Sequence, residues 1–396
     1  MVGKRVIGSC ALPLVLAACG AQEAWRADLR YLAQELPRRH ANAFHSTSQE
    51  RFAADVRELD AALETLSDDQ VLVGLMRIVA LVGDGHTHLD LPPNGPRYPF
   101  ELAWFGRELR IIAADAAHDV ALGAQVVGVG GRTLDDAMTL LAPLVPRGEN
   151  DRRTQLTASI LLTAPRVLHG LGLAPPSLHA AFALVTREGQ AITEALTPAL
   201  PREITTWHFV TEQPPLWLRR LSEPWWVELL SDRHTVYLSF SRYPPEAEFR
   251  ERSSELGRLL DRSGARRLVS DLRRNGGGDF TLVRRYLLPV LGDRRVYAII
   301  GPVTFSAAMV NALDLKRESN AVLVGEPTGG RPNSYSEHGE FPLPHSGLRV
   351  SYATRYYRFG EDADTAVEPD RRIEPTWQDF LSGRDPVLDW ILAQPE

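Results

Sequence analysis

Apolar residues in the first part of the chain recur three and four positions apart, as they do on one face of an α-helix. Between residues 23 and 82 this spacing predicts three helices, which cover 29–36, 52–66 and 68–82. Ser67 and Asp68 are suitable caps for the last of these helices. The polar segment 83–96, "GDGHTHLDLPPNGP", then interrupts the helical pattern with glycine and proline. We expect a small helical unit that ends in this histidine turn.

The last part of the chain, from residue 203 onward, alternates short apolar runs with amphipathic stretches. Strands are predicted at 235–243, 266–273, 295–301 and 321–326, and helices at 248–264, 280–291 and 306–319. Repeated strand-helix-strand units favour a mostly parallel sheet that is covered by helices. Binding and catalytic groups gather at the carboxyl ends of such strands. The segments "DLRRNGGGDF" and "GPVTFSAAM" each follow a predicted strand, so we expect them at the same edge.

The region between these two parts has a mixed pattern. It contains predicted strands at 101–106, 109–114 and 124–131, and a predicted helix at 134–144. The stretch 121–141 resembles half of a PDZ domain, and an ordinary strand-turn-helix unit explains it equally well. The predicted fold is therefore α/β, divided into a helical cap over 19–92, a mixed segment over 93–202 and an α/β core over 203–396.

The N-terminus has the features of an export signal. Two basic residues precede an apolar stretch, 6–18, that is too short to span a bilayer. The next residues, "LAAC", resemble the bacterial lipoprotein processing box, which would remove 1–18 and place a lipid on Cys19. Because Gly20 resembles an outer-membrane sorting residue, we expect a lipoprotein of the outer membrane that faces the periplasm. An ordinary cleaved signal with a chance cysteine is the alternative.

Composition narrows the classes of function. The chain has 396 residues, of which 44% are hydrophobic and 24% are charged, so it can bury a sizeable core. Its net charge of −6 is spread along the chain without a basic run, so we expect no nucleic-acid partner. Cys10 lies in the predicted signal, so we expect neither a disulfide nor a thiolate metal site in the mature chain.

Ser306 lies between the predicted strand "RVYAII" and the predicted helix "AAMVNAL". A serine in this position can cap the helix. It can also act as a nucleophile, because the helix N-terminus and the amide of Ala307 can hold a developing oxyanion. The glycines of "NGGG", 275–278, can turn further amides toward a ligand, and a simple tight turn is the alternative. This loop lacks the lysine and hydroxyl of a phosphate loop, which argues against nucleotide binding.

A serine nucleophile needs a base, for which lysine and histidine are the candidates. Lys316 is the only lysine outside the predicted signal, and ten residues of helix would place it about 15 Å along the axis from Ser306. A serine-lysine dyad is therefore not expected. Among the 11 histidines, His86 lies in a loop that is rich in glycine and carboxylates, so we select it as the base. A purely structural histidine is the alternative.

The same turn supports a competing metal hypothesis. Four of its residues alternate and would face one side of an extended strand, as metal ligands could. They are Asp84, His86, His88 and Asp90. The pattern resembles the zinc motif of metallo-β-lactamase-type hydrolases, except that Leu91 stands where that motif has its last histidine. Our main expectation involves no metal and no organic cofactor.

Seven segments, taken together and in order, resemble the tail-specific, or C-terminal processing, serine protease family. They are "GDGHTHL", "YLSFSRY", "LVSDLRRNGGGD", "TFSAAM", "LVGEPTGGRPNSY", "LPHSGLRVSYATRYY" and "VEPDRRIEPT". The resemblance covers nearly all of the predicted mature chain and implies a crotonase-like α/β core. It implies that Ser306 is the nucleophile and that Gly276 or Gly277 supplies an oxyanion amide beside that of Ala307.

Within this family, the chain resembles the histidine-dependent, tricorn-core-like branch. Arg331 lies in the region where the bacterial processing branch has its catalytic lysine, and an arginine stays protonated at neutral pH. The tricorn-core branch implies His86 as the base and a late carboxylate that orients it. Asp364 is our first choice for this carboxylate, Glu361 and Asp362 are its rivals, and solvated loop charges without a role are the alternative.

We therefore expect an exported, lipid-anchored serine peptidase that hydrolyses peptide bonds in a peptide or protein substrate through an acyl-enzyme on Ser306. A second hypothesis comes from another class of function: a non-catalytic lipoprotein of the same fold that binds a peptide or an apolar ligand. The third is a zinc hydrolase centred on His86 and His88.

Overall fold

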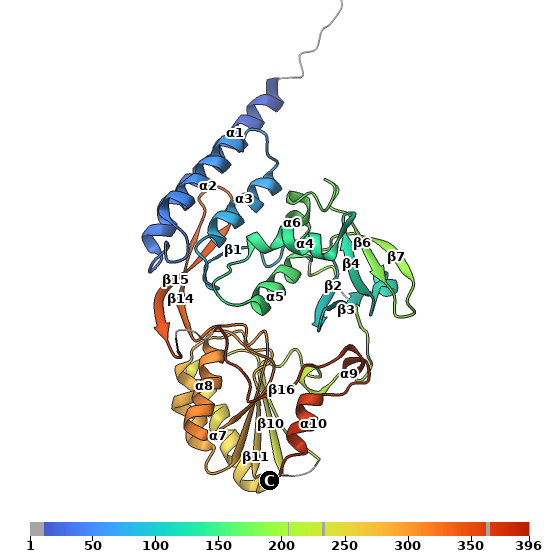
Figure 1. Ribbon diagram of the computed structural model, residues 1–396, viewed down its shortest axis with the longest axis vertical. Helices are drawn as coiled ribbons and strands as arrows, with labels where there is room; N and C mark the ends of the chain where they lie inside the picture. Colours follow the sequence, from blue (N-terminus) through green and yellow to red (C-terminus); the bar gives the residue numbers. More distant parts are fainter. Residues whose placement is uncertain (1–11, 205, 232–233, 362–364, 396) are drawn as a thin grey trace, which may run out of the picture.

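The computed structural model describes residues 12–204, 206–231, 234–361 and 365–395. Figure 1 shows a helical unit at one end, a mixed unit next to it, and an α/β core at the end that holds the C-terminus. Residues 1–11 of the predicted signal lie outside the described residues, as do Asp362 and Asp364. Cys19 lies within the first helix, α1.

The helical unit has the three helices that the apolar spacing predicted. They are α1 (Leu12–Arg39), α2 (Gln49–Ala62) and α3 (Asp68–Ala80). Ser67 starts α3 with a capping box, in which its hydroxyl accepts from the amide of Gln70 and the Gln70 side chain accepts from the amide of Ser67. In the part of the chain that is described, no helix is both long and apolar enough to cross a membrane.

The mixed unit is built on an antiparallel sheet with the strand order β2-β3-β4-β6-β7. Its strands are β2 (Phe100–Phe105), β3 (Glu108–Asp115), β4 (Gln125–Val129), β6 (Ala180–Val185) and β7 (Ala191–Leu196), with β5 (Arg132–Thr133) and β8 (Trp207–Phe209) beside them. Its helices are α4 (Leu134–Leu141), α5 (Asp151–Leu161) and α6 (Pro165–Gly170). Side chains of this unit and of the helical unit form one apolar core. The likeness to a PDZ domain stays a prediction.

The core contains the mostly parallel sheet that the strand-helix alternation predicted. Its order is β16-β13-β12-β11-β10-β9, and only the pairing of β9 with β10 is antiparallel. The strands are β9 (Trp225–Leu229), β10 (Thr235–Phe240), β11 (Arg267–Asp271), β12 (Arg295–Ile300), β13 (Val322–Gly325) and β16 (Arg371–Arg372). The helices are α7 (Glu246–Ser263), α8 (Ala307–Ser319), α9 (Trp377–Leu381) and α10 (Pro386–Leu392). The crotonase-like assignment of this core stays a prediction.

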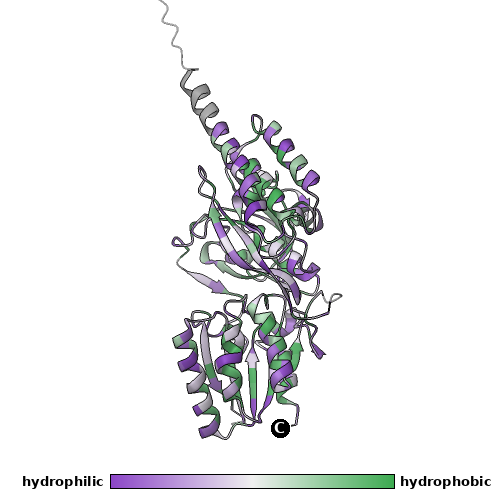
Figure 2. Cartoon of the chain, turned by 90° about the vertical axis from the view of Figure 1, so that its left-hand side faces the viewer, coloured by the Kyte–Doolittle hydropathy of each residue, from purple (hydrophilic) through white to green (hydrophobic). Residues whose placement is uncertain are grey.

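Helices cover both faces of the core sheet. On β10, Val236 and Leu238 join the apolar cluster that contains residues of α7 and α8, whereas Tyr237 joins the cluster that contains residues of α10. Successive side chains of a strand point to opposite faces, so a strand that is buried on both faces is apolar throughout. Figure 2 shows this distribution, with hydrophobic colour on the strands of the core and hydrophilic colour on the outer sides of its helices.

One predicted helix of the core differs in the structure. Residues 280–291 were expected to form an α-helix, but Val283–Leu287 form a π-helical turn and Leu288–Val290 a 3₁₀ turn. Pro289 has no amide hydrogen to donate and its ring clashes with the preceding turn, so a regular helix cannot run through it.

A long hairpin that the sequence pattern did not reveal joins the helical unit to the core. Its strands are β14 (Asn333–Pro342) and β15 (Arg349–Arg358), and β15 pairs with the short β1 (His88–Asp90). Figure 1 shows the hairpin extending from the core toward the helices of the other end. The pairing of His88 with Ser351 ties the histidine turn to a strand that leads back into the core.

Candidate active site

Ser306 occupies a sharp corner between β12 and α8. It has φ +51° and ψ −125°, a region that is strained for a residue with a side chain. It stands at the cap position of α8, yet its hydroxyl makes no capping hydrogen bond. Instead, its Oγ lies 3.0 Å from Nε2 of His86. The hydroxyl of Ser306 thus faces His86 and does not cap α8, and its role as the nucleophile stays a prediction.

The two ring nitrogens of His86 have different partners. Nδ1 lies 3.1 Å from the carbonyl oxygen of Tyr335, which can only accept, so Nδ1 carries the hydrogen. Nε2 therefore presents its lone pair to the hydroxyl of Ser306. The hydroxyl of Ser336 lies 3.3 Å from the same nitrogen. This tautomer is the one that a general base toward Ser306 requires.

Asp84 holds the histidine turn in shape. Its buried carboxylate accepts hydrogen bonds from the amide of His86 at 3.1 Å, from the hydroxyl of Thr87 at 2.9 Å and from Nε2 of His40 at 2.8 Å. Nδ1 of His40 accepts from the amide of Asn42, which fixes the hydrogen of that ring on Nε2. The carboxylate of Asp84 is thus fully engaged in building the turn.

A second buried carboxylate, that of Glu149, connects this turn to the loop after β13 through hydrogen bonds. One of its oxygens accepts from the amide of Gly85 and the other from the amide of Arg331, each at 3.0 Å. No side chain fits at Gly85, since a Cβ there would lie 2.8 Å from Cζ of Phe305 and 2.9 Å from the Glu149 carboxylate. Burial raises the pKa of Glu149.

The ring of Phe305 lies between a cation and the proposed base. The guanidinium carbon of Arg153 stands 4.1 Å from the centre of this ring, and the imidazole of His86 stacks on it at 4.8 Å. Burial lowers the pKa of His86 to about 4; the carboxylate of Asp84 acts in the opposite direction, and the charge of Arg153 lowers it further. His86 is therefore neutral, and able to accept a proton, at neutral pH.

The glycine loop lies directly against the serine. Gly277 has φ +119°, and a Cβ at this position would lie 2.8 Å from Cβ of Ser306, so only glycine fits. Its amide, however, donates to the side-chain oxygen of Asn275 at 2.9 Å. The short Asn275 side chain thus folds back onto the turn and occupies this amide, and the role of Gly277 as an oxyanion donor stays a prediction. In the described part of the chain, the amides of Gly276 and Ala307 make no hydrogen bond.

The predicted orienting carboxylate has no place among the described contacts of His86. Asp364, our first choice, and Asp362 lie outside the described residues, and Glu361 is exposed. The Nδ1 position that such a carboxylate would occupy is taken by the Tyr335 carbonyl. The role of Asp364 stays a prediction.

The four alternating residues of the metal hypothesis do not converge. Asp84 binds His40 and Thr87, and His88 pairs with Asp90 at 2.9 Å. Throughout the described ranges, no three histidine, cysteine or acidic side chains lie close enough to hold a metal ion.

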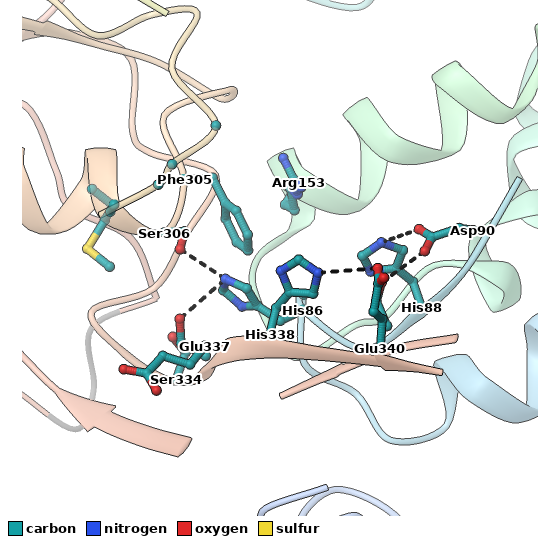
Figure 3. A pocket seen from close by; sticks show the side chains of 18 of the residues that line it. His86, His88, Asp90, Arg153, Phe305, Ser306, Ser334, Glu337, His338 and Glu340 are labelled. Atoms are coloured by element: carbon teal, nitrogen blue, oxygen red, sulfur yellow. Dashed lines mark hydrogen bonds and ion pairs between the residues drawn. The ribbon is translucent and has the colours of Figure 1, made fainter. Parts of the chain in front are cut away.

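Ser306, His86 and Phe305 line a cleft of about 850 Å³ between the core, the hairpin and the histidine turn. In Figure 3, Ser306 and Phe305 stand on one side of the cleft and His88 with Asp90 on the other. Glu337 and His338 of the hairpin also line it.

Three contributors to this site were not predicted from the sequence. Tyr335 acts through its backbone carbonyl, for which no side-chain pattern exists. Glu149 and Arg153 lie in "RGENDRRT", a polar stretch that marks only a helix start. A glutamate after a glycine does not by itself indicate a site residue. The role of Glu149 becomes visible only in the folded structure, where it contacts the histidine turn.

The strained backbone of Ser306 leads to a stability prediction. We expect Ser306→Gly to have a free energy of unfolding about 1 kcal/mol above that of Ser306→Ala, because only glycine adopts this conformation without strain. Urea denaturation of both variants measures the difference. Ser254 in α7 is the matched control, where the glycine variant should instead be about 1 kcal/mol less stable than the alanine variant. The same order at both sites would contradict the assignment of strain to Ser306.

The lowered pKa of His86 leads to a prediction of pH dependence. The rate at which a fluorophosphonate labels Ser306 should stay level from pH 7 to about pH 5 and fall with a midpoint near pH 4. Between pH 6.5 and 4, His86 binds a proton in the unfolded chain but not in the folded protein. The free energy of unfolding should therefore fall as the pH falls through this range. A labelling midpoint near pH 6.5 would refute this.

Arg153→Gln should raise this midpoint, since it removes a cation near His86. Arg152→Gln is its control, because Arg152 belongs to the same helix but pairs with Glu326 and Glu374.

Comparison with known proteins finds solved structures of similar fold. No family model and no curated protein matches the sequence. Mature CPAF complexed with lactacystin is similar at 13% identity with a TM-score of 0.64, over 93% of this chain and 97% of that chain. A second structure of mature CPAF is similar at 13% identity with a TM-score of 0.62, over 93% of this chain and 96% of that chain. The tricorn protease has 15% identity with a TM-score of 0.45, over 94% of this chain and 36% of that chain.

These neighbours are tail-specific proteases, the family that the sequence resembles. At this low identity the likeness concerns the fold, and for the fold the resemblance is confirmed. Over nearly its whole length, the chain has the fold of mature CPAF.

Proposed function

We propose that this protein is a serine peptidase in which Ser306 is the nucleophile and His86 the general base. The observation that carries the proposal is the 3.0 Å contact between Oγ of Ser306 and Nε2 of His86, whose other nitrogen is bound to the Tyr335 carbonyl. A serine hydroxyl becomes a nucleophile when a neighbouring base takes its proton. The shared fold with mature CPAF supports this function.

The reaction proceeds in two halves. Nε2 of His86 takes the hydroxyl proton as Oγ of Ser306 bonds to the carbonyl carbon of the scissile peptide. The negative charge moves to the carbonyl oxygen, where the free amide of Ala307, at the start of α8, can donate to it together with that of Gly276. His86 then gives its proton to the leaving amine, and an acyl-enzyme remains. A water molecule, deprotonated by His86, releases the acyl group.

The cleft suits a peptide or protein substrate. It is long enough to be lined by residues of the helical unit, the core and the hairpin together. Its walls offer polar groups, such as His88, Asp90 and Glu337. An extended chain needs such polar partners for its backbone amides and carbonyls.

Removing either proposed catalytic group should abolish activity. We expect Ser306→Ala and His86→Ala to lose peptide hydrolysis by at least about a thousandfold, because the two groups act as a unit. Ser306→Ala should also resist fluorophosphonate labelling. Peptide cleavage followed by mass spectrometry and labelling on a gel measure both effects.

Two variants that line the same cleft serve as controls. Ser334→Ala and His338→Ala remove a serine and a histidine that lie outside the proposed machinery, and both should keep activity within a few-fold. Failure of the folded wild-type protein to react with the probe would refute the catalytic proposal and favour a binding protein of the same fold.

The proposal includes export and a lipid anchor at Cys19, which the "LAAC" sequence supports. Wild-type protein expressed in a Gram-negative bacterium should incorporate labelled palmitate and enter the detergent phase on phase separation. Cys19→Ser should do neither. Incorporation of palmitate by the serine variant, or none by the wild type, would contradict the anchor.

A further inference from the structure

A second cavity, of about 340 Å³, opens beside the active-site cleft. The two share a wall, which is formed by Gly85, His88, Asp90, Leu91, Pro92 and Arg153. Neither Ser306 nor His86 lines the second cavity, whereas Gly85, His88 and Asp90 of the histidine turn do. The turn therefore lies between Ser306 and the second cavity. The second cavity thus adjoins the cleft but is separate from the reacting groups.

The interior of the second cavity is mostly apolar. Met76 comes from α3, Leu144 and Val145 from the segment that follows α4, and Leu161 from α5. All four are buried, with at most 7% of each exposed. Ile160 also lines the cavity, and 54% of its surface is exposed. An apolar side chain that entered here would remove this surface from water.

The reaction direction places this cavity relative to the scissile bond. His86 must hand its proton to the leaving amine, so the leaving fragment begins on the His86 side of Ser306. Gly85, next to His86 in sequence, lines the second cavity. Figure 3 shows that His88 and Asp90, which line both cavities, stand across the cleft from Ser306. The cavity thus adjoins the path of the leaving fragment.

We propose that the second cavity is the subsite for a large apolar side chain in the leaving fragment of the substrate, close to the scissile bond. This inference rests on the proposed peptidase function. The volume accommodates a leucine, methionine or phenylalanine side chain. Selectivity follows because an alanine at the same substrate position would leave the cavity unfilled and the exposed Ile160 uncovered.

Charged side chains also line the second cavity, namely Asp90, Arg97, Arg166 and Arg153. Of the three arginines, Arg153 is the one that also lines the active-site cleft, where it could favour an acidic occupant. Its guanidinium lines both cavities, and in the described part of the chain it makes no hydrogen bond or ion pair. It rests on the ring of Phe305, and the carboxylate of Glu149 counters its charge. We assign the cavity to an apolar side chain because its interior is apolar, and a preference for acidic residues is one of the outcomes that the experiment separates.

The experiment uses the full-length protein and peptides that differ only at positions of the leaving fragment. Cleavage sites are mapped by mass spectrometry, and kcat/KM is compared for leucine, phenylalanine, alanine and aspartate at the position after the scissile bond and at the next one. We expect leucine or phenylalanine at one of these positions to exceed alanine by about tenfold or more. Equal rates, or a preference for aspartate, would overturn the proposal.

Two variants test whether this cavity is the source of the preference. Thr157 lines only the second cavity, so Thr157→Trp should fill it and reduce kcat/KM for the large apolar peptide about tenfold while leaving the alanine peptide within threefold. Ile160→Ala, a change at an exposed side chain, should weaken the same preference without threatening the fold. Gln155→Trp, on the same helix but lining neither cavity, should change nothing.

Labelling of Ser306 by a small fluorophosphonate separates the two proposals. A wild-type protein that does not label would remove the peptidase function itself. Variants that label at the wild-type rate yet keep the full apolar preference would show that the cavity is not the subsite, while the peptidase function would stand.

Discussion

The hydrogen bond between Nε2 of His86 and the hydroxyl of Ser306 spans 220 positions of the sequence, and the rest of the structure serves to hold its two ends together. The serine stands on the core sheet, at the carboxyl edge of β12. The histidine stands in a turn of the helical unit. Neither unit has a complete site by itself, so the relative placement of the two units decides whether proton transfer can occur.

Three contacts maintain that placement. The pairing of β1 with β15 fixes the backbone of the histidine turn, the Tyr335 carbonyl fixes the imidazole, and Glu149 holds the turn to the loop beyond β13. Each uses hydrogen bonds in which at least one partner is a backbone group, at partly or fully buried positions where an unpaired polar group would be costly. The low pKa of His86 follows from the same burial, since the charged form of the ring loses its water.

The sequence was sufficient for the elements whose residues repeat with a clear period. The helices before residue 82 and the parallel strands of the core carry buried faces, and burial imposes that period. The β14–β15 hairpin was not predicted because no continuous apolar face marks β14. One of its faces carries serine, histidine and glutamate, and the aromatic residues of the other face are interrupted by Glu337 and Gly339. At the site, Ser306 and His86 could be chosen by their residue type, whereas the backbone carbonyl of Tyr335 and the occupied amide of Gly277 depend on loop geometry alone.

The order of the parts along the chain has a consequence for biogenesis. The histidine turn is synthesised first, the serine corner much later, and the hairpin that orients the imidazole later still. A nascent chain that stops before residue 306 carries a base without a nucleophile, and one that stops before residue 335 lacks the carbonyl that sets the tautomer. The proposed nucleophile, its base and the carbonyl that orients the base can therefore come together only after residue 335 has been synthesised and the two units have folded against each other.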